Sequence, residues 1–399
     1  GAQAVTADAI TLTGTIYATD GNNSIALSGP VTLEQNTAMT ASGVTFSSAL
    51  DSNDDGAATP ASLARTLGIT GNAIFGGAVG NSFELGSLSV SGTSAIDGGS
   101  VNTEGAQTYS DAVTLGAATT LASTSTGDIE FQSTLDGAFT LAVNTAGATI
   151  FGGAVGGASG SELVSLTTDS VGTVQINGGT VNTSGAAGMV FNEAAALGAN
   201  TTLTASNDGA ITFAGTLNGA FALTANTAGI TTFGGAVGGV AGSELVSLTT
   251  DADGSTQING GAITTAGTGN FMKFGDTVTL GANAALTAVD GNIAFDKSVD
   301  SATATARTLG LTAGTGDVTF TGLVGNTNTL GAVTVSSAQN LTVNGLRAAS
   351  FVQTAGTGTT TINTGAFTSM PQGVATTASA GVVINNDAIT ISDSIDTTG

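Results

Sequence analysis

The hexapeptide Phe75-Gly-Gly-Ala-Val-Gly80 begins again at Phe151 and at Phe233, and a variant, Phe-Thr-Gly-Leu-Val-Gly, begins at Phe320. By residue number, successive copies are 76, 82 and 87 positions apart. A motif that recurs at a nearly constant spacing is typical of a repeat protein, whose core grows along one axis. The repeat is therefore the first feature that the fold must explain.

Two further anchors recur in the same order as the hexapeptide. A Thr-Leu or Ala-Leu strand end recurs at Leu33, Leu115, Leu197 and Leu280, and an Ile-Asp/Asn-Gly-Gly turn recurs at Ile96, Ile176 and Ile258, with a weaker copy at Val343. These anchors predict internal repeats of roughly eighty residues. We place them at 31–104, 105–184, 185–266 and 267–350, with partial flanking coils at 1–30 and 351–399, in a single continuous domain of residues 1–399.

Within one repeat the chain alternates short strands and turns. Segments such as Asp111–Leu115, Asp128–Gln132 and Phe139–Val143 alternate apolar and polar residues, which predicts strands. Asp-Gly and Asn-Gly pairs supply turns, because Gly and Asn accept a positive φ at low cost. Few segments have helical periodicity, so we expect almost no helix.

A solenoid explains the repeat better than a sandwich does. A sandwich gives no reason for its sequence to repeat every eighty residues, whereas a solenoid stacks equivalent positions on one another. The sequence predicts an all-β solenoid of about nineteen coils of roughly twenty residues, about four coils for each repeat.

The phenylalanines are predicted to be core residues. Phe131, Phe213 and Phe295 are each 82 positions apart, too far to touch, so each ring is expected to lie between aliphatic side chains of the neighbouring coils. The alternative is an aromatic platform for a ligand, but Phe without Trp or Tyr is more typical of a core.

The composition excludes several classes of function. The chain has 28 Asp and Glu against five Lys and Arg, a formal net charge of −23, and no His or Cys. Nucleic acid is an unsuitable partner, because phosphate binding needs clustered basic residues. Triads that use His, thiol nucleophiles and His/Cys zinc sites are excluded outright. An acidic surface keeps a long apolar protein soluble and attracts divalent cations.

One acidic insertion has the pattern of a calcium loop. Asp51, Asn53 and Asp55, followed by Gly56, match the opening of such a loop, where oxygen ligands alternate and Gly makes a sharp turn. The Glu expected at the twelfth position is absent, because Ser62 stands there. The residues predict a calcium site, calcium being the one candidate cofactor, with an ordinary acidic turn as the alternative.

The two ends of the chain resemble each other. Asp387-Ala-Ile-Thr-Ile391 is similar to Asp8-Ala-Ile-Thr-Leu12, and neither end has an amphipathic helix that would cap an open coil. Uncapped coils expose strand edges that seek partners. We expect either continuation of the solenoid in a longer chain or end-to-end self-association. No signal peptide and no transmembrane segment is predicted within these residues.

Longer matches point to a known class of protein. Gly105-Ala-Gln-Thr-Tyr-Ser-Asp-Ala-Val-Thr-Leu-Gly116, and Asn-Thr-Ala-Gly-x-Thr-x-Phe-Gly-Gly-Ala-Val-Gly from Asn144 and again from Asn226, resemble the β-strand-repeat surface exoproteins of bacteria. These are the filamentous-haemagglutinin-like and autotransporter-like adhesins, and the resemblance covers most of residues 31–350. It implies a right-handed parallel β-helix that lies outside the cell or at its surface, as a fibre, an adhesin or a matrix component.

Three functions remain open at this point. We expect an extracellular structural protein, a building block of a bacterial surface fibre, sheath or matrix, and not an enzyme. The alternative is the stalk or passenger of a cell-surface adhesin, with a cell-surface or polysaccharide partner. A polysaccharide-degrading β-helix enzyme is a third candidate, but it would need clustered acids and bases, and repeated acids such as Glu162 and Glu244 occupy matching repeat positions instead.

Overall fold

The chain folds as stacked coils of short parallel strands. The computed structural model describes residues 1–20, 22–53, 64–267, 269, 271–367, 373–378 and 381–397, and within them it has strands and no helix. The strands pair in parallel with strands of the neighbouring coils. The predicted all-β parallel solenoid is thus confirmed, with about 17 turns instead of nineteen.

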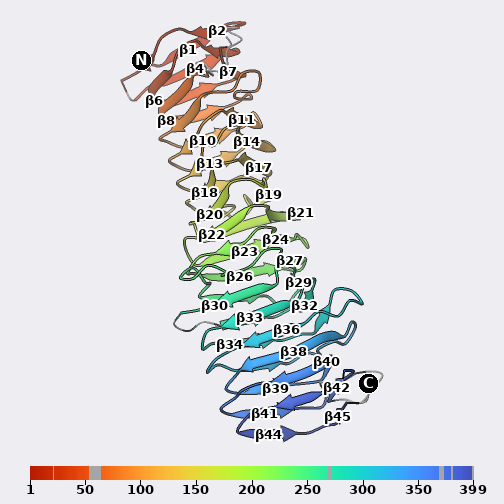
Figure 1. Cartoon of the computed structure of the whole chain (residues 1–399). Coiled ribbons are helices and arrows are strands. Elements are labelled where there is room, and N and C mark those ends of the chain that lie inside the picture. The colour runs from red at the N-terminus through yellow and green to blue at the C-terminus, as the bar shows by residue number, and fades with distance from the viewer. Residues whose placement is uncertain are drawn as a thin grey trace. The chain divides into compact units, whose positions relative to one another are not determined.

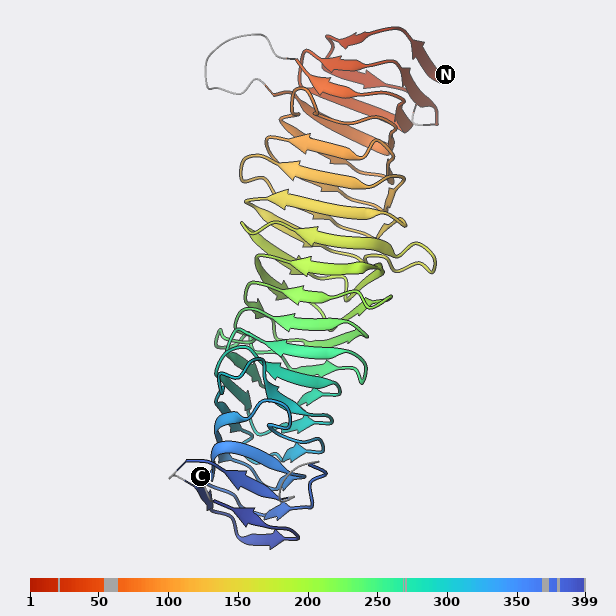
Figure 2. The same cartoon turned by 90° about the vertical axis from the view of Figure 1, so that its right-hand side faces the viewer.

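The strands group into two compact units, Gly1–Ala196 and Leu197–Gly399. The boundary falls inside the third predicted repeat, 185–266. In each unit the strands stack in chain order, as Figures 1 and 2 show for β1 to β20 and for β23 to β45.

Three faces make up each coil of the first unit. The first face holds β1 (Gln3–Thr6), β4 (Ser24–Ser28), the second halves of β6 (Thr37–Phe46) and β8 (Thr66–Phe75), β10 (Ser94–Ile96), β13 (Val113–Leu115) and β16 (Leu135–Asp136). The second holds β2 (Ile10–Leu12), β5 (Val31–Leu33), β7 (Leu50–Ser52), β11 (Ser100–Thr103), β14 (Thr119–Ser123), β17 (Thr140–Thr145), β19 (Leu163–Thr168) and the second half of β21 (Thr180–Phe191), whose first half continues the first face. The third holds β3 (Ile16–Ala18), the first halves of β6 and β8, β9 (Ser87–Val90), β12 (Gln107–Tyr109), β15 (Ile129–Phe131), β18 (Ala148–Phe151) and β20 (Thr173–Ile176).

The second unit repeats this arrangement, after β22 (Ala194–Leu197). One face holds β23 (Thr201–Ala205), β26 (Ala222–Thr227), β28 (Ser247–Thr250), β31 (Phe271–Phe274), β34 (Asn292–Phe295), β37 (Val318–Phe320), β39 (Leu341–Val343), β41 (Thr359–Ile362) and β44 (Ala388–Ile391). The next holds β24 (Ile211–Phe213), β27 (Ile230–Phe233), β29 (Ser255–Ile258), β32 (Thr277–Leu280), β35 (Val299–Ser301), the first half of β40 (Leu346–Gln353), β42 (Val374–Thr376) and β45 (Ile395–Asp396). The last holds β25 (Leu217–Asn218), β30 (Ala262–Thr265), β33 (Ala284–Ala288), β36 (Leu309–Thr312), β38 (Leu330–Ser337), the second half of β40 and β43 (Val382–Ile384).

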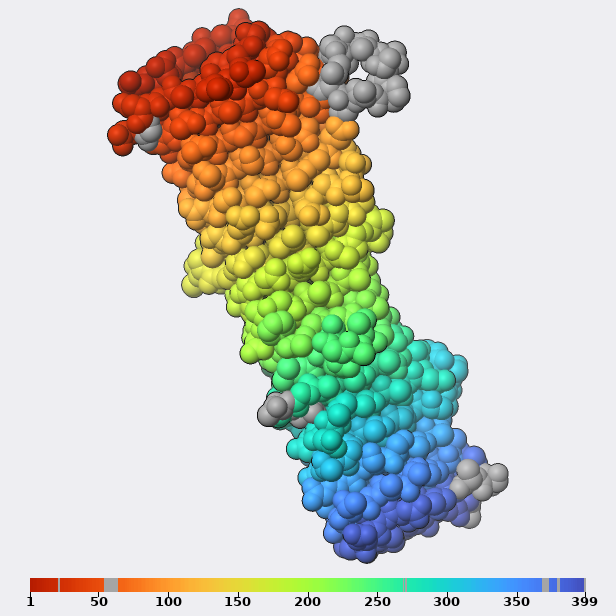
Figure 3. Space-filling model, turned by 60° about the vertical axis from the view of Figure 1, so that its left-hand side comes forward, coloured from red at the N-terminus to blue at the C-terminus, as the bar shows by residue number. Residues whose placement is uncertain are grey.

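The core of each unit is a set of inward ladders. Apolar side chains alternate with polar ones along the strands, so that Val113 and Leu115 are buried while Thr114 between them is exposed. Parallel pairing in register then places each buried side chain directly on its counterpart one coil away. In the space-filling view the colour changes gradually within each unit, because every coil lies on the one before it (Figure 3).

The buried rings form aromatic ladders, which corrects one prediction. Phe131 is stacked on Tyr109 at 5.4 Å between ring centroids and on Phe151 at 5.7 Å. The same stacking recurs for Phe213 on Phe233 at 6.2 Å. The expectation that each ring lies between aliphatic side chains is wrong, because a coil of about twenty residues brings two phenylalanines of one repeat into direct register. Aliphatic side chains follow at the ends of the ring stack, where Val90 pairs with Tyr109 and Ile176 with Phe151.

The repeat is not a whole number of turns, which corrects a second prediction. Phe75 pairs with Ile96 on the first face, whereas Phe151 pairs with Phe131 on the third. The two copies of the motif therefore lie on different faces, and equivalent positions of successive repeats are not stacked. The predicted figure of about four coils for each repeat is slightly high, because some coils take more than twenty residues: Phe131 and Phe151 are 20 positions apart, but Phe151 and Ile176 are 25 apart.

The hexapeptide turns the chain from one face to the next. Phe75 ends one strand, and Val79 forms a parallel bridge to Leu50 and Val101 on the following face. Gly80 has a φ of +63°, and its N–H donates to the Leu50 carbonyl at 2.7 Å. A Cβ added there would lie 2.1 Å from the Asn102 carbonyl oxygen. The last Gly of the motif is therefore required by both conformation and space.

Candidate functional site

The first coil of the first unit is open on one side. Among the described residues, β1 pairs only with β4, β2 only with β5 and β3 only with β6. One edge of each strand thus carries backbone N–H and C=O groups that no other strand takes up. Such edges are ready templates for pairing with a further strand.

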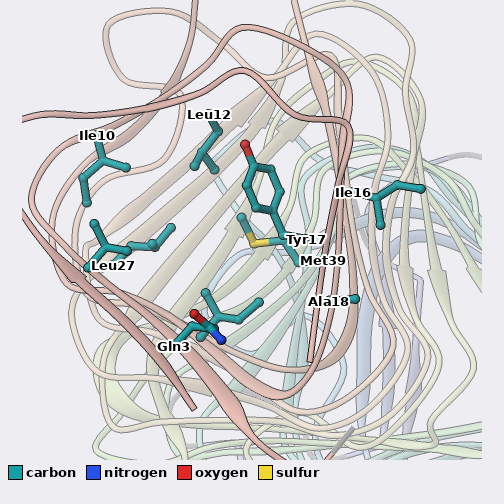
Figure 4. A pocket seen from close by; sticks show the side chains of 10 residues that line it. Gln3, Ile10, Leu12, Ile16, Tyr17, Ala18, Leu27 and Met39 are labelled. Carbon is teal, nitrogen blue, oxygen red and sulfur yellow. The ribbon is translucent and has the colours of Figure 1, made fainter. Parts of the chain in front are cut away.

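An apolar cavity of about 350 Å³ opens at this end. Ile10, Leu12, Tyr17, Leu27 and Met39 surround it (Figure 4). These are the side chains that a further coil would cover in the rest of the ladder. Ile16 lies on the outer side of its strand, apart from this group, and is 74% exposed. The cavity is therefore lined by the inward side chains of the first coils that the structure describes.

The last strands of the second unit are open in the same way. Among the described residues, β43, β44 and β45 each pair with one earlier strand, on β40, β41 and β42 respectively. Ile389 and Ile391 of β44 pair with buried Thr360 and Ile362, so they point inward, yet they are 46% and 50% exposed. Among the described residues, no later coil lies on these inward side chains.

Asp51, the first predicted calcium ligand, lies in the middle of β7 and is half-buried. Its Oδ1 accepts hydrogen bonds from the backbone N–H groups of Ser82 at 2.9 Å and Phe83 at 3.3 Å. One carboxylate oxygen thus anchors the loop that follows the hexapeptide on the next coil.

The other two predicted ligands lie beyond β7. Asn53 is half-buried, and its Nδ2 donates to Glu34 Oε2 at 2.6 Å. Asp55 lies outside the residues that the structure describes. The calcium site therefore stays a prediction, and Glu34 is a further carboxylate beside it.

The anchoring role of Asp51 recurs at equivalent positions of other repeats. Asp136 Oδ1 accepts from the Ala158 N–H, and Asp300 Oδ1 accepts from the Thr327 N–H. Asn218, which carries no charge, does the same for Val240. The loop anchor needs an acceptor oxygen and no negative charge.

Two buried acids occupy equivalent corners of the two units. In the first unit, Glu193 is 4% exposed, and its Oε2 accepts a hydrogen bond from the Thr168 hydroxyl. Burial raises the pKa of Glu193, and the nearby charge of Asp169 raises it further. Burial likewise raises the pKa of Asp169. Protons are therefore held at this corner to a higher pH than is usual for carboxyl groups.

In the second unit, Asp276 takes the place of Glu193. It accepts from the Thr250 hydroxyl at 2.8 Å and from the Thr256 hydroxyl at 2.9 Å. Burial raises the pKa of Asp276, and the charge of Asp251 adds to this effect. The pKa of Asp251 is also raised, by burial first and then by Asp253, while Lys297 opposes the shift.

The sequence reasoning did not single out these corners, although a signal was present. Thr168-Asp169 and Thr250-Asp251 are 82 positions apart, the spacing of the repeat. Asp169 and Asp251 are only partly buried. The repeated threonines beside them, Thr168 and Thr250, hold the buried acids Glu193 and Asp276.

Two negative findings apply to the described part of the chain. It contains no group of three or more Asp and Glu side chains arranged to hold a metal ion. None of its segments is a helix long and apolar enough to cross a membrane.

Comparison with known proteins adds no relative: no family model, curated protein or solved structure matches the chain.

Proposed function

We propose that the chain is an extracellular structural protein, a β-solenoid building block of a bacterial surface fibre, sheath or matrix. The observation that supports this most strongly is that the strands serve mainly to build the stacked core. Nearly every strand of the described residues contributes inward side chains to the ladders, as at Phe131, Phe213 and Phe295. A chain whose strands mainly extend a solenoid core is typical of a spacer or a fibre.

The surface charge fits this role. A net charge of −23 keeps an apolar solenoid soluble and makes its lateral association unfavourable at low salt. End-to-end assembly of copies is part of the proposal, because contact between acidic sides is unfavourable. Location outside the cell is part of the same proposal.

We infer no catalytic role. The chain has neither His nor Cys, and its buried acids, Glu193 and Asp276, are engaged with threonine hydroxyls at equivalent corners. Groups that recur in this way support the coils around them.

Immunogold electron microscopy of intact cells that make the protein tests this proposal. We expect label on surface filaments or matrix before the cells are permeabilised. Label that appears only after permeabilisation would refute an extracellular role. Label on single projections whose loss abolishes attachment to other cells would favour the adhesin stalk instead.

A further inference from the structure

The Glu193 corner of the first unit holds buried carboxyl oxygens that lack hydrogen-bond partners. Glu193 is 4% exposed, and its Oε2 accepts from the Thr168 hydroxyl. Its Oε1 is buried and has no hydrogen-bond partner among the described residues, and the same holds for Oδ1 of Asp169. The two carboxyl groups are close enough that the charge of Asp169 raises the pKa of Glu193. Burying such oxygens without a partner is costly, so a positive charge at this corner would stabilise the fold.

One difference between the repeats explains the unpaired oxygen of Glu193. In the second unit, Asp276 accepts from the Thr250 hydroxyl at 2.8 Å, and both of its oxygens accept from the Thr256 hydroxyl at 2.9 Å. Val174 stands 82 positions before Thr256, the spacing of the repeat, and both side chains are fully buried. Valine has no hydroxyl, so Glu193 keeps one threonine partner where Asp276 has two.

The turns beside the two acids have the same conformation. Gly172 has a φ of +80° and Gly254 has a φ of +72°. A Cβ added at either glycine would lie 2.1 Å from a carbonyl oxygen one coil earlier. The carbonyl of Ser170 in the first turn therefore corresponds to the carbonyl of Ala252 in the second.

The second corner carries its own positive charge. Lys297 follows β34, two coils after β28, and its Nζ donates a hydrogen bond to the Ala252 carbonyl. The same ammonium opposes the rise in the pKa of Asp251, so it lies near that carboxyl group. In the sequence, Gly215 stands 82 positions before Lys297, and Arg65 is the one basic residue of residues 1–196. The repeat therefore supplies no equivalent ammonium for the first corner.

We propose that the corner of the first unit binds a monovalent cation of the size of an ammonium ion, such as potassium. Its ligands are Oδ1 of Asp169, Oε1 of Glu193 and the carbonyl oxygen of Ser170, and because Ser170 is exposed, water can complete the shell. Backbone carbonyl oxygens replace the hydration shell of potassium in ion channels, and carboxylates add the opposite charge. Such a site would stabilise the solenoid whether or not copies form fibres, so it goes beyond the proposed structural function.

The charge balance favours a monovalent cation over a divalent one. A single ammonium serves the second corner, although the carboxyl groups of Asp251, Asp253 and Asp276 interact there. The first corner has two such groups, Asp169 and Glu193. Divalent sites usually gather more oxygen ligands, and the described part of the chain has no group of three or more acids arranged to hold a metal ion.

Native-state hydrogen exchange of the full chain tests the site. Exchange is compared in potassium chloride and in tetramethylammonium chloride, at one pH and at about 0.15 M ionic strength, because tetramethylammonium has the same charge but is too bulky to enter between side chains. At about four times the Kd of potassium, amides of β19 and β21 should exchange about fivefold more slowly. Amides of β28 and β31 should not respond, because Lys297 already supplies the charge there. Ammonium should act like potassium, and lithium should not.

Variants exchange the character of the two corners. Glu193→Gln and Asp169→Asn each remove a charged ligand and should abolish the potassium response of β19 and β21. Val174→Thr supplies the missing hydroxyl partner of Oε1 and should weaken that response. The reciprocal double variant, Lys297→Gln with Thr256→Val, should make β28 and β31 respond to potassium.

Asp111→Asn is the control for the loss of a charge elsewhere in the first unit, since Asp111 is exposed. It should keep the potassium response. Glu193→Gln and Lys297→Gln decide the question even if the changes at the buried Val174 and Thr256 disturb the fold.

The outcomes distinguish the cation site from its alternatives. Equal exchange in potassium, lithium and tetramethylammonium would overturn the site and leave a shared proton to neutralise the two acids. A response to calcium and not to potassium would overturn the monovalent identity. A potassium response that persists in Glu193→Gln would place the cation elsewhere and overturn the assignment to this corner.

Discussion

Replacing Phe131 with Ala tests the aromatic ladder, and its effect can be estimated from the structure. The ring is 1% exposed and stacked on both sides, on Tyr109 and on Phe151. Truncating a buried Phe to Ala costs about 3 to 5 kcal/mol. Because aromatic pairs contribute beyond their buried area, we expect a value near the upper end, about 4 to 5 kcal/mol.

Native-state hydrogen exchange is the suitable assay, because the cores of repeat proteins respond locally. Amides of β12, β15 and β18 should exchange on the order of a thousandfold faster in the variant, since each 1.4 kcal/mol is a factor of ten. Amides of β4 and β5, several coils away, should change little.

Phe139→Ala is the matched control, because this ring is 37% exposed and its loss should cost less than about 1 kcal/mol. Phe131→Leu should lie between the two variants, since it keeps apolar volume and loses the stacking. If Phe131→Ala changed exchange no more than Phe139→Ala did, the ladder would not be what stabilises the coils.

The remaining predictions concern the acids and the hexapeptide. Burial raises the pKa of Glu193 and of Asp276, so the folded chain holds protons that the unfolded chain releases. Stability should therefore fall as pH rises above about 4, and Glu193→Gln with Asp276→Asn should flatten that fall in urea titrations. Asp51→Ala should cost about 0.5 to 1.5 kcal/mol, since the exposed N–H groups of Ser82 and Phe83 can turn to water, whereas Asp51→Asn should keep the anchor. Both should remove any calcium heat in calorimetry, and no heat with the unmodified chain would refute the calcium site. Gly80→Ala should lower the melting temperature by more than Gly43→Ala, since a Cβ meets nothing within 4 Å at the latter.

The repeat made the fold predictable without any relative. Three anchors in constant order, at Phe75, Ile96 and Leu115 and their copies, exclude most architectures, and the alternation of apolar and polar residues supplies the strands. In the structure these three residues form one column, since Phe75 pairs with Ile96 and Ile96 with Leu115.

The number of solenoid turns could not be predicted accurately from the number of residues. Loops at the corners differ in length, so a coil takes 20 residues from Phe131 to Phe151 and 25 from there to Ile176. The sequence contains no direct measure of how much of each interval is loop. The stacked phenylalanines and the shift of the repeat between faces depend on that division.

The candidate sites were harder to predict than the fold for a related reason. Burial of Glu193 and Asp276 depends on threonine hydroxyls one coil away, which become neighbours only when the register is known. Asp51 matched a calcium pattern, but its backbone partners lie 31 and 32 residues later. Contacts across coils, and not local spacing, decide what these side chains do.

Electron microscopy of the purified chain tests the central claim most directly. In about 1 M salt, where charges are screened beyond about 3 Å, we predict unbranched fibres. Discrete single particles at every salt concentration would contradict a fibre-forming solenoid.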